Sequence, residues 1–140
     1  MENKEGKILT KPNNIIPIPT SLDTTFFRWW VEILKPLHKL TEREMDVITA
    51  FLKKRYELSK DILDPVKLDK YLMSDDVKKE IREECNITSA HFQVIMGKLK
   101  KQKILKDGRI TPKFIPNVKE EDDNFQLLFY FNLNDLHRGS

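Results

Sequence analysis

The chain has 140 residues, and its hydrophobic content of 39% is enough for the core of one ordinary domain. Its 25 basic and 22 acidic side chains leave a formal net charge of only +3, so the overall charge does not indicate a nucleic-acid partner. The single cysteine excludes an internal disulfide, and the sequence contains no signal peptide and no apolar run of the roughly 20 residues that cross a membrane. We therefore expect a cytoplasmic protein with no part in the membrane.

Residues 1–22 are predicted to form an extended arm. Pro12, Pro17 and Pro19 lie among Asn, Lys and Thr residues, and prolines at this density prevent a helix. Two interpretations remain open: the arm is disordered on its own, or it lies along a partner.

The first predicted helix begins after Ser21 or Asp23, either of which can cap it, and Pro36 ends or kinks it. Its apolar residues cover more than one face, so the helix needs burial on two sides. It is either a central core helix or a helix shared with another subunit. The second interpretation assigns a protein interface to four aromatic residues, Phe26, Phe27, Trp29 and Trp30.

Three further helices are marked by capping signals. Thr41 and Glu44 form a capping box at the start of "LTEREMDVITAFLKKRYEL". Asp64 caps a short helix with Pro65 at its first position, and Ser74 caps the helix in "SDDVKKEIREECN".

The helix that starts at Ser74 carries Val77, Ile81 and Cys85 on one apolar stripe. We interpret Cys85 as a small core residue and not as a nucleophile, because no partner base is placed nearby. Asn86 is expected to end this helix in the left-handed conformation.

The stretch "NITSAHFQVIMGKLKKQKIL" predicts the next helix, with Thr88 as its cap. The buried face should consist of Phe92, Ile95, Met96 and Leu99. A run of lysines follows at the C-terminal end of this helix.

Beyond this helix the pattern changes from helix to strand. "KDGR" is a tight-turn signal, "RITPKFIP" is strand-like, and "FQLLFYFNL" predicts a second strand after the polar loop "NVKEEDDN". The sequence therefore predicts a mainly α domain over residues 23–133 with a small C-terminal β-hairpin. Residues 134–140 are expected to form a flexible tail.

Two helices joined by "CNITS" and followed by a hairpin resemble a winged helix-turn-helix domain, over Leu40 to Leu133. "LTEREMDVI" and "SAHFQVIMGKL" resemble parts of the LuxR-type helix-turn-helix, and "IMGKLKKQKILKDGRITPKFIP" is similar to the passage from recognition helix to wing in MarR-like and phage-encoded proteins. The chain as a whole is similar to bacteriophage proteins such as small terminase subunits and virion neck components. The resemblance implies a winged-helix fold in the host cytoplasm or the virion.

In a helix-turn-helix the second helix enters the major groove, and its N-terminal residues contact base edges. Near the start of this helix, the side chains that can hydrogen-bond a base are Ser89, His91 and Gln93. The side chains of Ala90, Val94 and Gly97 on the same face cannot. Base reading is therefore weakly supported.

Phosphate contact is better supported. Residues 88–113 contain seven basic residues and one acidic residue, a local balance of +6. The cations that we expect to contact DNA are Lys98, Lys100, Lys101, Lys103 and Arg109. The alternative is an ordinary solvated helix end, because lysines also complement the helix dipole.

The predicted wing loop "VKEEDD" has four acidic residues and one lysine, a balance of −3 that phosphates would repel. If DNA is bound, this loop should not touch it. An acidic loop and a basic helix also suit contact between copies of the chain. The alternative is a solvated loop with no partner.

The sequence shows no nucleophile with a base, no phosphate loop and no metal-ligand spacing, so we expect neither an enzyme nor a cofactor, metal or small-molecule substrate. The prediction is a DNA-binding winged-helix protein, either a phage regulator or a small packaging subunit, that binds double-stranded DNA mostly through phosphates. The alternative is a structural component of a phage particle that uses the winged helix for protein packing. Either class is expected to form a homo-oligomer or a larger assembly.

Overall fold

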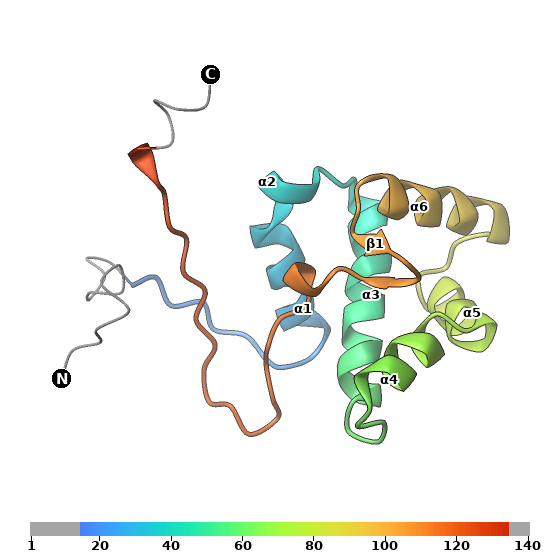
Figure 1. Ribbon diagram of the computed structural model, residues 1–140, viewed down its shortest axis with the longest axis horizontal. Helices are drawn as coiled ribbons and strands as arrows, with labels where there is room; N and C mark the ends of the chain where they lie inside the picture. The colour runs from blue at the N-terminus through green and yellow to red at the C-terminus, as the bar shows by residue number, and fades with distance from the viewer. Residues whose placement is uncertain (1–14, 135–140) are drawn as a thin grey trace. The chain divides into compact units, whose positions relative to one another are not determined.

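The computed structural model describes residues 15–134, in which six α-helices precede a two-stranded hairpin and a short 3-10 turn (Figure 1). The helices are α1 (Thr24–Ile33), α2 (Lys35–His38), α3 (Glu42–Leu58), α4 (Pro65–Leu72), α5 (Asp75–Glu84) and α6 (Ser89–Lys101). The hairpin consists of β1 (Leu105–Lys106) and β2 (Arg109–Ile110), and the 3-10 turn is η2 (Pro112–Phe114). The prediction of a mainly helical chain with a small hairpin after the helices is confirmed.

The helices begin at the residues that the capping signals predict. Asp23 caps α1, and Thr41 with Glu44 forms the complete capping box of α3. The remaining predicted caps each accept a hydrogen bond from a backbone N–H of the first turn: Asp64 of α4, Ser74 of α5 and Thr88 of α6. Local hydrogen bonding thus fixes where each of these helices starts.

Helix α3 is the centre of the unit from Thr20 to Asn117. It packs against α1, α4, α5 and α6 (Figure 1). All six residues from Val47 to Leu52 are buried, a run that covers every side of a helix. The sequence suggests burial on two sides for the first helix, but the helix that is buried on several sides is α3.

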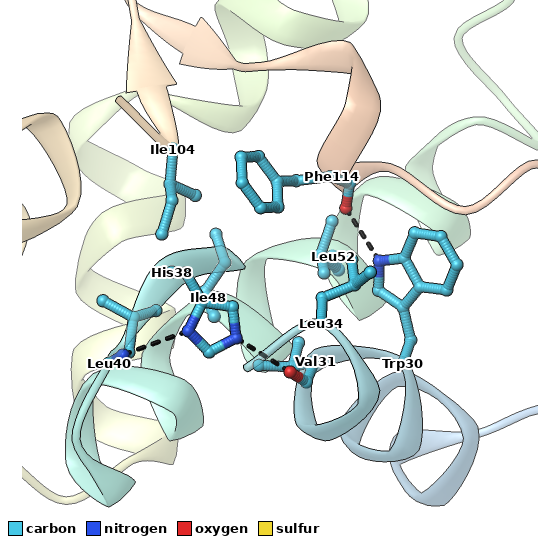
Figure 2. Close-up of a pocket in the computed structure, with 9 residues that line it drawn as sticks. All are labelled: Trp30, Val31, Leu34, His38, Leu40, Ile48, Leu52, Ile104 and Phe114. Carbon is cyan, nitrogen blue, oxygen red and sulfur yellow. Dashed lines mark hydrogen bonds between the residues drawn. The ribbon is translucent and has the colours of Figure 1, made fainter. Parts of the chain in front are cut away.

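Helix α1 lies on α3 and contributes three of the four aromatic residues of its sequence to the core. Phe26, Phe27 and Trp30 are buried, whereas Trp29 is exposed. The Trp30 indole N–H donates to the Phe114 carbonyl at 2.9 Å, which ties α1 to η2 (Figure 2). The core interpretation holds for these three buried residues.

His38 joins the end of α2 to the interior through both ring nitrogens. The ring is only 3% exposed; Nε2 donates to the Val31 carbonyl at 2.8 Å, and Nδ1 accepts from the Leu40 N–H at 3.0 Å (Figure 2). A carbonyl only accepts and an N–H only donates, so the ring is the neutral form with its proton on Nε2. His38 therefore satisfies two buried backbone groups across the break that Pro36 makes between α1 and α3.

Replacing His38 with Ala should lower the free energy of unfolding by about 2–4 kcal/mol, because each orphaned backbone group costs about 1–3 kcal/mol when it stays buried. Chemical denaturation of H38A and of H91A measures the effect. His91 is exposed on α6, so H91A is the matched control and should stay within about 0.5 kcal/mol of the wild type. Equal losses in the two variants would contradict this role for His38.

The hairpin is shorter than the predicted one and pairs different residues. Leu105 lies opposite Ile110 and Lys106 opposite Arg109, in an antiparallel register. Both turn residues, Asp107 and Gly108, have positive φ, as the tight turn of "KDGR" requires. The buried Leu105 and Ile110 attach this hairpin to the core.

The predicted strand in "FQLLFYFNL" is wrong, because residues 125–132 form neither strand nor helix. "RITPKFIP" is a strand only at Arg109 and Ile110, since Pro112 has no N–H to donate and begins η2 instead. Within residues 15–134, the sheet consists of β1 and β2 alone.

Residues 15–19 and 118–134 belong to a second unit of the chain. Residues 15–20 have no regular secondary structure, as expected for the proline-containing arm. The predictions for residues 1–14 and for the tail from residue 135 onward lie outside the described residues. No helix within residues 15–134 is both long and apolar enough to cross a membrane.

Candidate nucleic-acid interface

Helix α6 is held beside α5 by a short turn, and this turn is fixed from α3. Asn86 has a φ of 55°, the left-handed conformation expected at the end of α5. The Arg43 guanidinium donates to the Cys85 carbonyl at 2.6 Å, a carbonyl at the open end of α5. Arg43 therefore caps α5 and positions the start of α6.

Asp46 holds Arg43 in place and joins α1 to the same network. Its carboxylate pairs with Arg43 at 3.0 Å and with Arg28 of α1, while Arg28 also pairs with Glu32 at 3.1 Å and with Glu42 at 2.6 Å. These side chains are partly exposed, so each pair contributes little stability alone. Their effect is on geometry, because they connect the α5–α6 turn to α1 through α3.

The exposed side of α6 has two different halves. Its first half presents the three possible base contacts, Ser89, His91 and Gln93, all of them exposed. Between them lies a face without hydrogen-bonding side chains, where Val94 is 69% exposed and a Cβ on Gly97 would meet nothing within 4 Å. The buried face is Phe92, Ile95, Met96 and Leu99, as predicted.

The second half of α6 carries lysines that have no acidic partner. Within residues 15–134, no carboxylate lies within salt-bridge distance of the four predicted phosphate contacts Lys98, Lys100, Lys101 and Lys103. Lys98 is partly exposed and the other three are exposed. Their charge is therefore available to an anionic partner.

The basic residues in the second half of α3 are paired. Lys54 of α3 lies 2.7 Å from Glu80 of α5, and this hydrogen bond raises the pKa of Lys54. Lys53 pairs with Glu57 at 2.9 Å, and Arg55 pairs with Asp69 at 3.0 Å. These paired cations of α3 therefore differ from the unpaired lysines at the end of α6.

Arg109, the fifth predicted phosphate contact, is partly engaged in an ion pair within the chain. Its guanidinium lies 3.8 Å from the buried Asp69 of α4, whose other oxygen pairs with Arg55 of α3. Asp69 thus attaches β2 to α4 and α3. The Arg109 side chain is still 51% exposed, and its contact with DNA stays a prediction.

The observed hairpin changes the electrostatics expected for the wing. The acidic residues Glu120 to Asp123 lie outside it, in the second unit of the chain. The tip that the hairpin does present has Lys106 and Arg109 against Asp107, a balance of +1. The tip of the observed hairpin is therefore not the acidic loop that the sequence predicts for the wing.

The aromatic interface predicted on α1 is reduced by burial. Phe26, Phe27 and Trp30 are buried in the chain, and Trp29, 43% exposed, is the member of the four that offers surface to another subunit. An interface at Trp29 stays a prediction.

Cys85 follows α5 at the start of the turn. Its thiol faces the backbone carbonyl of Asp46 in α3, at 3.8 Å. Burial raises the pKa of this thiol from 9.0 to about 11, with smaller contributions from Glu84 and Asp46, whereas Arg43 opposes the shift. A raised pKa keeps the thiol neutral and makes it a poor nucleophile. Within residues 15–134, no three His, Cys, Asp or Glu side chains are grouped to hold a metal.

The Cys85 thiol should therefore titrate with a midpoint near pH 11 in the folded chain and near pH 9 in the unfolded chain. At about pH 8 the thiolate fraction falls about 100-fold on folding, and alkylation by iodoacetamide should slow by a similar factor. Folding favours the neutral thiol, so this contribution to stability is complete below pH 9 and is lost as the pH rises through 11. Mass spectrometry of alkylation against pH gives both midpoints, and identical midpoints would contradict the prediction.

The sequence did not indicate Arg43 or Asp69 as residues that build the site. Arg43 and Cys85 are 42 positions apart, and Arg109 and Asp69 are 40 positions apart, so no local pattern links them. The spacing of Arg43 and Asp46 on one helix face was the available signal, but it points to an ordinary surface pair.

The chain was also compared with protein-family models, curated proteins and solved structures, and none matched it.

Proposed function

We propose that this chain is a non-enzymatic DNA-binding protein with a winged helix-turn-helix, in which α5 and α6 form the motif and the β1–β2 hairpin forms a small wing. The order of these elements and the exposure of α6 support the proposal. Double-stranded DNA is bound mostly through its phosphates.

The cluster of unpaired lysines at the C-terminal end of α6 and just after it, beside the hairpin, is the observation that carries this proposal. A lysine already paired with a carboxylate gains little from a phosphate, whereas a solvated lysine releases a condensed counterion from DNA when it binds. Lys98, Lys100, Lys101 and Lys103 are of the second kind, and the hairpin tip next to them is also positive. Asp107 is the one acidic side chain of the hairpin, so the hairpin offers little repulsion to a phosphate that contacts these lysines.

The first half of α6 is expected to add little sequence selectivity. Val94 and Gly97 occupy positions where a sequence-reading helix carries donors or acceptors. The biological role that we propose is that of a phage regulator or small packaging subunit, in the host cytoplasm or the virion. This role follows from the resemblance of the chain to phage winged-helix proteins.

Replacing Lys98, Lys100 and Lys101 together with Ala should weaken binding to a duplex at least about tenfold at low salt. The slope of log K against log salt should fall by roughly 2–3, since each lost phosphate contact removes about 0.9. Fluorescence anisotropy of a labelled duplex across a salt series measures both quantities.

The matched control removes the same charge elsewhere, by replacing Lys35, Lys67 and Lys70 with Ala. These lysines are exposed on α2 and α4, so the control variant should keep the wild-type salt slope. Equal losses in the two triple variants would show that net charge alone is responsible. A wild-type chain that binds no duplex at low salt would rule out the proposal.

The second candidate function is a packing module in a phage particle, and the neutral face of α6 favours it. Val94, 69% exposed beside Gly97, is suited to contact with another protein and not with a base edge. In this case α6 would be covered by protein, and the lysines would lie at the rim of the contact.

Replacing Val94 with Asn separates the two candidates, because it changes no charge. DNA binding through phosphates predicts an affinity within about twofold of the wild type, the usual effect of a surface substitution. A packing module predicts loss of assembly in V94N with retention of assembly in the lysine variant. Anisotropy for DNA and co-sedimentation with particle components distinguish these outcomes.

A further inference from the structure

The segment "FQLLFYFNL", residues 125–133, exposes large apolar side chains in the second unit of the chain. Phe129 is 53% exposed, Phe131 79% and Leu133 69%. The complete set of exposed apolar residues in this segment is Leu127, Leu128, Phe129, Tyr130, Phe131 and Leu133. Soluble proteins seldom leave such a contiguous apolar surface uncovered, so the segment calls for a partner.

The central part of the same segment, residues 126–131, has an unpaired backbone. The segment runs as an extended trace (Figure 1), and residues 125–132 belong to no strand or helix. Residues 126–131 make no hydrogen bond with any part of the described chain. An extended backbone with free N–H and C=O groups is a template for strand pairing.

The side chains follow the two-residue period of a strand. Odd-numbered positions from Phe125 to Leu133 are all apolar, whereas even-numbered positions begin with Gln126 and end with Asn132. Aromatic and branched residues of this kind favour strands, and the segment contains no proline. A pairing partner would therefore find one continuous apolar face.

The segment is complementary to itself in one antiparallel register. With Phe129 of one copy opposite Phe129 of another, Gln126 lies opposite Asn132, and every other opposed pair is apolar. A shift of one residue would pair the apolar odd-numbered positions of one copy with the even-numbered positions of the other, which include Gln126 and Asn132. A shift of two would set an amide opposite Tyr130 or Leu128. This register alone keeps amides with amides and apolar side chains together.

We propose that residues 125–133 of two copies pair as antiparallel strands about a two-fold axis at Phe129 and so form a homodimer. The two-fold axis makes the contact closed, because each copy uses the same surface. The segment lies outside the unit that carries α6, and the dimer requires no DNA.

The surface available is of the size that a stable dimer needs. A fully buried aromatic side chain contributes about 150–250 Å², so Phe129, Tyr130 and Phe131 of two copies carry roughly 900–1,500 Å² as an upper limit, of which strand pairing covers a part. Specific interfaces bury about 1,200–2,000 Å² in total. The leucines of the segment, and Ile15 and Ile16 of the same unit, 75% and 82% exposed, add apolar surface that the ribbon can cover.

Disulfide crosslinking tests the register in the full-length chain with Cys85 replaced by Ala. The substitution Phe129→Cys brings two thiols directly opposite each other, whereas Leu128→Cys and Tyr130→Cys leave them on a diagonal too long for a disulfide. Under mild oxidation F129C should form a covalent dimer at least about fivefold faster than L128C or Y130C. Equal rates at the three positions would overturn the proposal.

A second pair of variants keeps Phe129 intact. A mixture of Gln126→Cys and Asn132→Cys chains should crosslink between the two kinds of copy, whereas each variant alone should not. Circular dichroism checks that α1–α6 stay folded. A wild-type chain that sediments as a monomer at the crosslinking concentration would overturn the proposal, and so would a dimer that F131D leaves unchanged.

Discussion

The middle of helix α3, from Val47 to Leu52, is buried on every side, and the positions of the other helices follow from this constraint. These six consecutive residues are at most 8% exposed, because α1, α4, α5 and α6 cover them. The polar ends of α3 then fix the attachments: Arg43 and Asp46 hold the α5–α6 turn and α1, while Arg55 holds α4 and the hairpin through Asp69. The outward face of α6 is a consequence of this packing, because its apolar face is used against α3.

The same packing explains the distribution of charge. Two cations of α3 are paired across helices, Lys54 with Glu80 and Arg55 with Asp69. Those at the far end of α6 have no carboxylate within reach in the described chain. A net charge of only +3 therefore conceals a local surplus of free positive charge. It is this local surplus, and not the overall composition, that supports phosphate binding.

Local signals predicted the helix starts well, because a cap such as Thr88 bonds to a backbone N–H three residues away and leaves its signature in the sequence. The apolar stripes were predicted for the same reason. Pairing between distant residues was not predicted correctly. "FQLLFYFNL" has the composition of a strand but pairs with no strand within the described residues. Burial is equally non-local, so α1 was a candidate for the central helix until its packing on α3 was known. The clamp from Arg43 to Cys85 depends on two segments 42 positions apart that the sequence could not bring together.

The central claim is that α6 and the hairpin form one positive surface that binds the phosphates of double-stranded DNA. An NMR titration of the full-length chain with a short duplex, following each backbone amide at low salt, tests this claim most directly. We expect the amides of Ser89 to Lys101 and of the turn at Gly108 to shift together, while those of α1 and α4 stay in place. Unchanged spectra, or shifts centred on α1 or α4, would contradict it.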